Sequence, residues 1–411
     1  MKILIAADGR SPITRRWVRG LLAMQNEVIL VSTFPCQPLE GVAEMIVLPV
    51  AFASLSGSQA GRGGKPAETD THQPAQPPRS RRLVARFRNL FQRVRYSLGP
   101  LTLRYYGPQF RRVAQRVQPD VIHALRIPFE GMLASYAPPE MPLAVSIWGN
   151  DLTLHGKGSA AMRRFTTRTL QRADGLAADA QRDIRLARAW GFDADKPVMT
   201  VPGSGGIDLV EISTARPMPV LPDLPQFPED TPLVINPRGF RPGSVRNDIF
   251  FQAVPMVLER VPDAHFLCAA MQGQEEAQSW LERLEIGRRV HLLPYLAQEQ
   301  LWAIFQRAAV SVSISAHDGT PNSLLEAMAI GCFPIAGDIE SLREWIVPGV
   351  NGLLVEADKA QALAEALVLA LTIPSLRGQA AEVNRAIIQE RAELNLVRSQ
   401  IAVFYERLLQ G

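Results

Sequence analysis

The sequence of 411 residues is poor in several features that mark whole classes of proteins. It has only three cysteines, Cys36, Cys268 and Cys332, which lie far apart and form neither a CxxC pair nor a zinc-ligand spacing. We therefore expect reduced thiols in a cytoplasmic protein and no cysteine-bound metal. No apolar run reaches the roughly 20 residues of a membrane-spanning helix, and the N-terminal run that ends at Asp8 is too short for a signal peptide.

Lysine is also scarce, with five among 44 basic residues, and acidic residues are absent from Thr71 to Pro119. That stretch holds eleven arginines, and its apolar residues recur at helical spacing over about 81–98, which predicts a basic amphipathic helix. Such a helix can bind an anionic membrane surface, but a helix packed on its own sheet with solvated arginines explains the pattern equally well. No RNA-binding signature accompanies it, so we expect no nucleic acid as a partner.

Strand and helix patterns alternate along most of the chain, which is typical of parallel α/β sheets. We predict an N-terminal α/β domain over 1–205, a second over 206–388, and a helix within 389–411 that packs back on the first domain. Residues 53–82 interrupt the first domain with Gly, Ser, Pro, Gln and Thr, and we interpret them as a flexible insertion. The loop after the first strand lacks GxGxxG, which disfavours a dinucleotide cofactor.

A strand followed by a helix start in the second domain predicts an anion site. A buried strand around Val310–Ile314 ends in a turn at Asp318 and Gly319, and we expect a helix to open at Pro321, because proline suits the first helical position. The positive end of a helix attracts anions, and phosphate is the usual occupant. Three consecutive amides would be free to bind it, those of Asn322, Ser323 and Leu324.

An acidic residue lies inside this otherwise apolar helix. Leucine, alanine, methionine and isoleucine flank Glu326, so its carboxylate should be buried and must find hydrogen-bond partners. Glu326 lies four residues after Asn322 and shares the face that carries the anion site. We interpret it as a ligand for a ribose diol, with a glutamate on a solvated helix face as the alternative.

Three arginines, Arg238, Arg241 and Arg246, lie in the loop after the predicted strand Leu233–Asn236. Open α/β sheets bind ligands at the carboxyl ends of their strands, and the arginine fork matches phosphate. We therefore expect one or two of the three to bind a diphosphate, while solvation is an equally good interpretation of any one of them alone.

These features together resemble the retaining glycosyltransferases of family 4, which belong to glycosyl transferases group 1. Asp318 and Glu326 match the acidic pair of that family, with seven residues between them. The resemblance covers nearly the full length and is strongest between Arg238 and Val355. The other matching segments are Gly331, Pro348–Val355, Pro237-Arg238, Gly205–Asp208 and Trp148–Asp151. The family has the GT-B fold, two Rossmann-like doubly wound domains that face each other across a cleft, and the resemblance implies this fold here.

The resemblance also implies an activity, the transfer of a sugar from a nucleotide-diphosphate sugar to a glycan, lipid-linked or small-molecule acceptor. Such reactions build cell-envelope polysaccharides or glycolipids, and the enzyme would be cytoplasmic, with 81–98 as a contact to the inner membrane face. By the resemblance, Glu326 holds the ribose, Arg238 and Arg246 bind the diphosphate, and Asp318 lies by the transferred sugar. The remaining donor-site residues would be Gly319, Asn322, Ser323, Leu324 and Arg241.

On the acceptor side, the resemblance places Asn150 and Asp151 at the cleft. Arg10, near the first loop, is a candidate for acceptor contact, with a structural role at the helix start equally open. The chain departs from the family where Asp318 replaces the usual glutamate, where Arg246 replaces a common lysine, and where Gly149 to Asp151 replace a loop with a histidine. We interpret His155 nearby as a surface histidine.

We expect no metal and no cofactor, because arginines and helix amides can stabilise a leaving phosphate. The DxD pattern of Asp193 and Asp195 lies in a helix-to-strand turn, and we attribute it to chance. Two other classes remain open, a non-catalytic protein that binds a nucleotide sugar and another GT-B-like enzyme such as an epimerase or a phosphorylase. A phosphorylase needs a buried lysine for its pyridoxal cofactor, and the five lysines offer no evident candidate.

Overall fold

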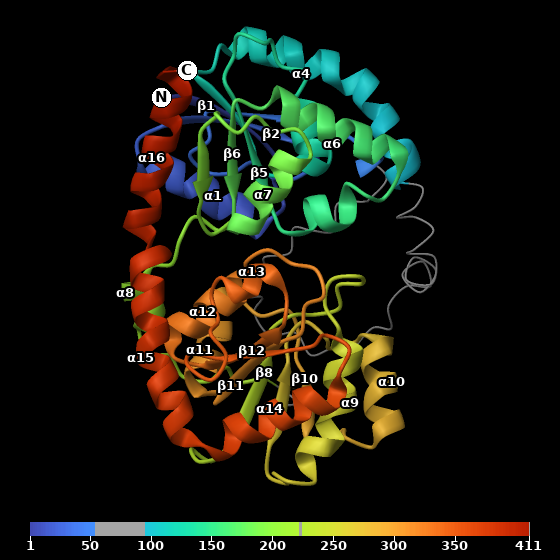
Figure 1. Cartoon of the computed structure of the whole chain (residues 1–411), viewed down its shortest axis with the longest axis vertical. Helices are drawn as coiled ribbons and strands as arrows, with labels where there is room; N and C mark the ends of the chain where they lie inside the picture. Colours follow the sequence, from blue (N-terminus) through green and yellow to red (C-terminus); the bar gives the residue numbers. More distant parts are fainter. Residues whose placement is uncertain (54–94, 222–223, 411) are drawn as a thin grey trace, which may run out of the picture.

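The computed structural model describes residues 1–53, 95–221 and 224–410. The predicted insertion at 53–82 lies outside these ranges except for Ala53. Of the predicted basic helix at 81–98, only residues 95–98 are described, and they are helical. The described residues form two halves, each built on a parallel sheet with helices around it, and one half lies above the other in Figure 1.

The N-terminal half is built on a seven-stranded sheet in the order β3-β2-β1-β4-β5-β6-β7, in which every strand pair is parallel. Its strands are β1 (Lys2–Ala7), β2 (Glu27–Ser32), β3 (Glu44–Val47), β4 (Val121–Ala124), β5 (Leu143–Ile147), β6 (Gly175–Ala178) and β7 (Val198–Thr200). Successive side chains of a strand point to opposite faces, so Leu4 packs in one core cluster and Ile5 in another. Helices cover both faces, which explains why the central strands β4 and β5 are buried along their whole length and mostly apolar.

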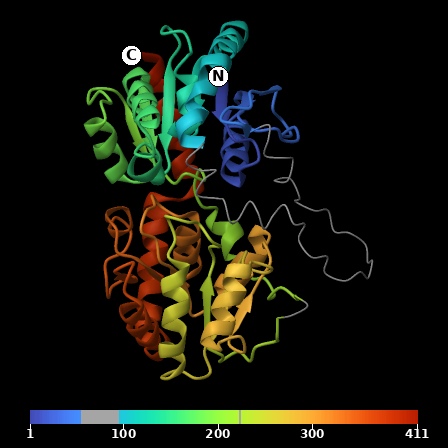
Figure 2. The same ribbon diagram turned by 90° about the vertical axis from the view of Figure 1, so that its right-hand side faces the viewer.

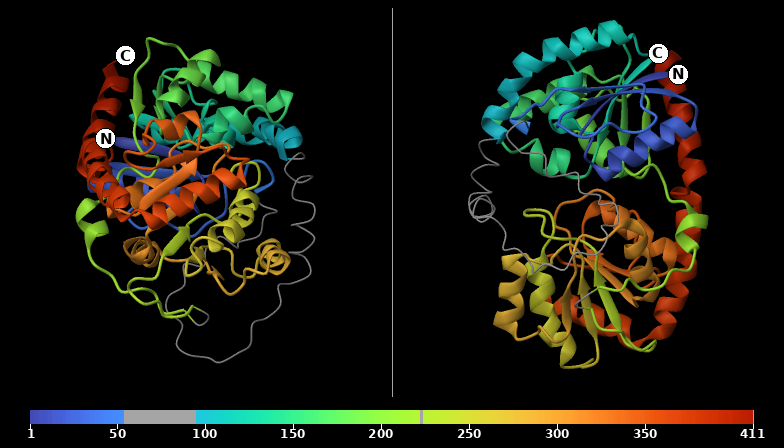
Figure 3. Two further views of the ribbon diagram at one scale, coloured as in Figure 1. Left: turned by 60° about the horizontal axis from the view of Figure 1, so that its bottom comes forward. Right: turned by 180° about the vertical axis from the view of Figure 1, so that it is seen from behind.

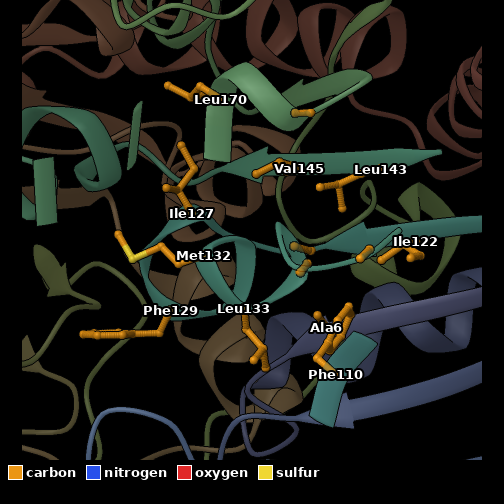
Figure 4. Close-up of a cluster of buried hydrophobic side chains, with 14 of the residues drawn as sticks. Ala6, Phe110, Ile122, Ile127, Phe129, Met132, Leu133, Leu143, Val145 and Leu170 are labelled. Carbon is orange, nitrogen blue, oxygen red and sulfur yellow. The ribbon is translucent and has the colours of Figure 1, made fainter. Parts of the chain in front are cut away.

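Figure 4 shows the larger of these two clusters, where side chains of the sheet such as Ile122 and Val145 face Phe110 and Leu133 from the helical layer. The helical segments of this half are α1 (Pro12–Ala23), η2 (Gly99–Thr102), α4 (Leu103–Val117), η3 (Ile127–Gly131), α5 (Met132–Ala134), η4 (Asp151–His155), α6 (Ala160–Arg172) and α7 (Gln181–Ala189).

The C-terminal half repeats the design with a six-stranded parallel sheet in the order β10-β9-β8-β11-β12-β13. Its strands are β8 (Leu233–Asn236), β9 (His265–Cys268), β10 (Val290–Leu292), β11 (Val310–Ser313), β12 (Phe333–Gly337) and β13 (Leu353–Val355). Its helices are α8 (Leu209–Ser213), α9 (Asn247–Leu258), α10 (Glu275–Leu284), α11 (Gln298–Arg307), α12 (Asn322–Ile330), α13 (Glu340–Arg343), α14 (Ala360–Thr372) and α15 (Pro374–Arg391). The predicted α/β class, with two doubly wound domains, is confirmed.

The last helix, α16 (Leu394–Gln410), leaves the C-terminal half and runs along the side of the N-terminal sheet (Figure 1). Ile401, Phe404 and Tyr405 pack there in the same cluster as Trp17. The hydroxyl of Tyr405 lies 2.7 Å from Nδ1 of the buried His123, whose Nε2 lies 2.8 Å from the hydroxyl of Ser146.

Across the described ranges, single helices are all too short or too polar to span a bilayer. Only α14 and α15, bent by 93° between them, reach such a length and composition as a pair.

Strand order fixes where the two halves present their loops. In an open parallel sheet, ligands bind where the strand order reverses, outside the carboxyl ends of the strands. The reversal falls between β1 and β4 in the first sheet and between β8 and β11 in the second. The two halves face each other in Figures 2 and 3, so the loops that follow these strands meet between the domains.

Candidate active site

A cavity of about 860 Å³ lies between the two halves. The loops after β1, β4, β5 and β6 line it from the N-terminal side, and the loops after β8 and β11 with the start of α12 line it from the C-terminal side. Both strand reversals therefore open into one shared space, which is where a ligand of either domain would bind.

The start of α12 forms part of the C-terminal wall. Pro321 caps the helix in an extended conformation, so the helix begins one residue later than expected, at Asn322. Asn322 and Ser323 line the cavity, and Oδ1 of Asn322 is buried without a hydrogen-bond partner in the described structure. The amide of Leu324 donates to the carbonyl of Pro321 at 3.0 Å, which corrects the expectation that it is free. The anion-binding capacity of this helix start therefore rests on two amides rather than three.

Glu326 also lines the cavity and is 2% exposed. Its Oε1 accepts a hydrogen bond from Arg16 Nη1 at 3.2 Å, and its Oε2 accepts one from Gln298 Nε2 at 2.8 Å. Burial raises the pKa of Glu326, and the charge of Arg16 opposes this rise. Because Arg16 belongs to α1, this ion pair joins the two halves across the cavity.

Arg238 and Arg241 lie beside the start of α12 and line the same wall. Arg238 is 7% exposed, and its Nη1 donates to the carboxylate of Asp318 and to the hydroxyl of Ser315 at 3.0 Å. The positive charge of Arg238 lowers the pKa of Arg241, and burial adds to the effect. Two arginines that repel each other create a positive wall, which an anion would neutralise.

Four of the residues predicted for the site are not among the described residues that line the cavity. Arg246 instead pairs with Asp248 through Nε and Nη2 at 2.8 and 2.7 Å, so the structure does not bring it to the predicted diphosphate site. Leu324 packs in the core below α12, and Gly319 lies against the carboxylate of Asp179. The fourth, Asp151, is fully buried and accepts a hydrogen bond from Arg126.

The two halves are in close contact where the backbone of Gly149 meets the Asp318-Gly319 turn. Arg182 of α7 spans this junction, because its Nη1 donates to the carbonyl of Asp318 at 2.7 Å and its Nη2 donates to the carbonyl of Gly149 at 3.0 Å. The hydroxyl of Thr320 donates to the carbonyl of Asp179 at 2.5 Å. These bonds hold the domains in a closed arrangement on one side of the cavity.

On the N-terminal wall, Asn150 and Arg10 line the cavity as predicted. The side-chain amide of Asn150 donates from Nδ2 to the hydroxyl of Ser244 in the other half at 3.3 Å. Arg10 forms two 3.0 Å bonds to Asp8 and stacks 3.6 Å above the Phe34 ring. Asp151 is fully buried and forms an ion pair with Arg126 at 2.8 Å. It therefore stabilises the loop after β5 and does not face a ligand.

Sequence reasoning missed Glu130 and Asp179 and assigned His155 to the surface. Glu130 is 4% exposed, accepts a hydrogen bond from Thr33 at 2.8 Å, and has its pKa raised to about 7 by burial. Burial raises the pKa of Asp179 well above its usual value, with neighbouring carboxylates adding to the effect. His155 lines the cavity 2.5 Å from the hydroxyl of Tyr96, and burial lowers its pKa to about 4. A usable signal was that Asp179 directly follows the end of β6, and that Glu130 lies among apolar residues in the segment after β4.

Comparison with known protein families gives two matches. The model described as glycosyl transferases group 1 matches residues 241–372, and the glycosyl transferase 4-like domain matches residues 9–203. The phosphatidyl-myo-inositol mannosyltransferase of Mycolicibacterium smegmatis is 26% identical over 54% of this chain and 55% of its own length. The D-inositol 3-phosphate glycosyltransferase of Corynebacterium urealyticum is 32% identical over 29% of this chain and 30% of its own length. The alignments thus span about a third to a half of these relatives.

Solved structures match the chain over its whole length at low identity. HepE of Anabaena in complex with UDP and glucose has a TM-score of 0.68 at 16% identity and covers 99% of both chains. The sucrose-phosphate synthase of Thermosynechococcus elongatus has a TM-score of 0.71 at 16% identity and covers 100% of this chain and 99% of its own. At this identity the likeness shows the fold, which is the GT-B arrangement of two Rossmann-like domains.

Proposed function

The chain belongs to the group 1 glycosyltransferases, and on that premise we propose that it transfers a sugar from a nucleoside-diphosphate sugar to an acceptor with retention of the anomeric configuration. The acceptor we propose is a glycan, a lipid-linked intermediate or a small molecule of cell-envelope polysaccharide or glycolipid synthesis. HepE structures with UDP and with UDP-glucose support a nucleotide-sugar donor. The names of the two relatives, which act on inositol compounds, support an acceptor of this kind.

One observation carries the proposal. The start of α12, the buried carboxylate of Glu326 and the guanidinium of Arg238 all face the same cavity at the strand reversal of the C-terminal sheet. Two amides at a positive helix end and a buried arginine suit a diphosphate, and a carboxylate one turn further along the helix suits a ribose diol. This combination fits a nucleoside diphosphate better than it fits a neutral sugar alone.

The chemistry we propose depends on charge stabilisation. As the bond between the sugar and the diphosphate breaks, negative charge grows on the leaving phosphate, where Arg238, Arg241 and the helix amides would stabilise it. Asp318, held by Arg238 and Ser315, would lie beside the transferred sugar. The acceptor hydroxyl would attack on the same face that the phosphate leaves, and closure of the domains would exclude water. We propose that this reaction requires neither metal nor cofactor.

We further propose that the enzyme works in the cytoplasm and that the arginine-rich segment 81–98 contacts an anionic membrane surface. This part rests on the sequence alone, since most of that segment lies outside the described residues. Sedimentation with anionic and with neutral vesicles tests it, and equal recovery with both would contradict it.

The donor site can be tested by thermal unfolding of the purified chain with a panel of nucleoside diphosphates and their sugars. A ligand at a hundred times its dissociation constant stabilises a protein by about 2.7 kcal/mol, which raises the melting temperature by a few degrees. We expect one base to give this shift and Glu326→Gln to weaken its binding by about 10- to 100-fold, because a charged hydrogen bond to the ribose is lost.

Glu282→Gln on the exposed face of α10 is the matched control and should leave the shift unchanged. If no nucleotide shifts the melting temperature of the wild-type chain, the proposed donor site is wrong. If a nucleotide binds but its sugar is never turned over with any acceptor or with water, the alternative of a non-catalytic binding protein is favoured.

A further inference from the structure

The N-terminal wall of the cavity contains two arginines whose hydrogen-bonding capacity is not filled. Arg95 and Arg126 both line the cavity, and the Nε atom of each is buried without a hydrogen-bond partner in the described structure. Burial is the main cause that lowers the pKa of Arg95, and the positive charge of Arg126 adds to it. Burial also acts to lower the pKa of Arg126, but the charges of Asp151 and Glu130 outweigh it and raise that pKa. A buried donor without an acceptor is costly, and two such donors on neighbouring cations are costlier.

The carboxylates around this pair are already engaged. Asp8 is held by both nitrogens of the Arg10 fork, and Asp151 is held by Arg126 through Nη2 and by two backbone amides. Glu130 is close enough to affect both Arg95 and Arg126 electrostatically, but its hydrogen bond comes from Thr33. Within the described ranges, no carboxylate forms an ion pair with Arg95.

Aromatic rings hold both guanidinium groups in place. The guanidinium carbon of Arg95 lies 4.8 Å from the ring centre of Phe129 and 5.6 Å from that of Phe34. The guanidinium of Arg126 lies 5.8 Å from the ring of Trp148 and is also tied to Asp151. Stacked guanidinium groups lose little freedom when they bind, which suits them to planar, bidentate contacts with an oxyanion.

We propose that Arg95 and Arg126 form a second anion site that binds a phosphate group on the acceptor. The inference rests on the proposed function and specifies its acceptor class, a phosphate ester whose free hydroxyl faces the donor sugar. The site is separate from the donor phosphates, which the start of α12, Arg238 and Arg241 would bind on the opposite wall. Two phosphate sites on facing walls of one cavity would bring the two substrates together at its centre.

The phosphate group can belong to a soluble ester or to a lipid headgroup, and the test separates these sources. The donor site is first filled with a saturating nucleoside diphosphate, which must itself raise the melting temperature. One arm then titrates sn-glycerol 3-phosphate, with glycerol as its uncharged counterpart, and follows the further shift. The second arm titrates a short-chain phosphatidylglycerol below its critical micelle concentration, with the matching phosphatidylcholine as its counterpart, so that no membrane surface is present to bind the segment 81–98.

The test variant is Arg95→Gln, because among the described residues Arg95 has no ion pair whose loss would leave a buried carboxylate unpaired. Arg104→Gln, on the exposed face of α4, is the matched control for the loss of one charge. We expect wild type and Arg104→Gln to bind at least one phosphate probe, and Arg95→Gln to bind it about 10- to 100-fold more weakly, with unchanged affinity for the nucleoside diphosphate.

The outcomes separate the two proposals. If the nucleoside diphosphate does not bind, the proposed function fails before the second site is examined. If it binds but neither phosphate probe binds, or if Arg95→Gln binds the probe as well as Arg104→Gln does, the second anion site is refuted while the proposed function stands. If Arg95→Gln unfolds, Arg95→Lys replaces it, and retained binding of the nucleoside diphosphate with weakened binding of the probe supports the site.

Discussion

Replacing Gly149 with alanine should force the two halves of the molecule apart where its loop meets the Asp318-Gly319 turn. Gly149 has a φ of +43°, which residues with a β-carbon rarely adopt, and a β-carbon built there would lie 1.7 Å from the amide nitrogen of Gly319. Because ordinary van der Waals contacts begin at 3.4 Å, the two loops would have to separate by about 1.7 Å. The three atoms nearest to that β-carbon all belong to the backbone of Asp318 and Gly319, so no side-chain rotation can relieve the clash.

The separation would break the bonds of Arg182, whose fork spans the junction between Gly149 and Asp318. It would also move Asp318 and Arg238 away from the N-terminal wall. A misplacement of about 1 Å at a reacting centre can cost on the order of 100-fold in rate. We therefore expect turnover of the donor to fall about 100-fold or more in Gly149→Ala, with nucleotide affinity changed far less, because the donor wall lies in one half.

Two measurements check this prediction, donor turnover and the radius of gyration from small-angle X-ray scattering. Gly349→Ala is the matched control, since Gly349 has a φ of +78° but nothing within 4 Å of a built β-carbon. It carries the same backbone strain, about 1 to 2 kcal/mol, without the clash. If Gly149→Ala matches Gly349→Ala in both turnover and radius of gyration, the clash between the domains does not control the active arrangement.

Two further predictions concern buried polar groups of the N-terminal half. Burial raises the pKa of Glu130 to about 7 from an ordinary value of 4.5, so its contribution to stability is present below pH 4.5 and is lost as the pH rises through 7. The free energy of unfolding of Glu130→Gln should therefore rise relative to that of wild type by on the order of 3 kcal/mol between pH 4.5 and pH 8. Urea unfolding at both pH values measures this, and the same difference between variant and wild type at both would contradict it. Tyr405→Phe leaves the buried His123 without its 2.7 Å partner and should lower the free energy of unfolding by about 1 to 3 kcal/mol, and an unchanged urea midpoint would refute it.

Much of the fold could be predicted because the strands of buried parallel sheets read as short apolar runs. β8 has the bounds expected for it, Leu233–Asn236, and the helix after β11 begins within one residue of Pro321. The sheet orders could not be read from the sequence, because register and neighbours depend on contacts between residues far apart in the chain. The bounds predicted for the domains stay predictions.

The donor wall was more accessible to sequence reasoning than the acceptor wall. Glu326 and the start of α12 lie in one short segment, so local spacing was enough to place them together. Arg16 could not be paired with Glu326 from the sequence, since 309 residues separate them and the bond exists only when the two halves meet. Arg246 was misplaced for a different reason, because Asp248 lies only two residues away and satisfies its fork locally.

The return of α16 to the first sheet affects how the chain can fold during synthesis. The chain enters the C-terminal half at Ile207 and returns from it at Leu394. Two backbone hydrogen bonds join the segments there, from the amide of Ile207 to the carbonyl of Ala392 at 2.8 Å and from the amide of Leu394 to the carbonyl of Ile207 at 2.9 Å. The C-terminal half is thus an insertion within the N-terminal one. Because the core around Trp17 needs Phe404 and Tyr405, the domain that emerges first from the ribosome is completed last. A truncation before Leu394 would leave that face of the first sheet covered only in part, by α1, and would expose apolar surface on a partly finished domain.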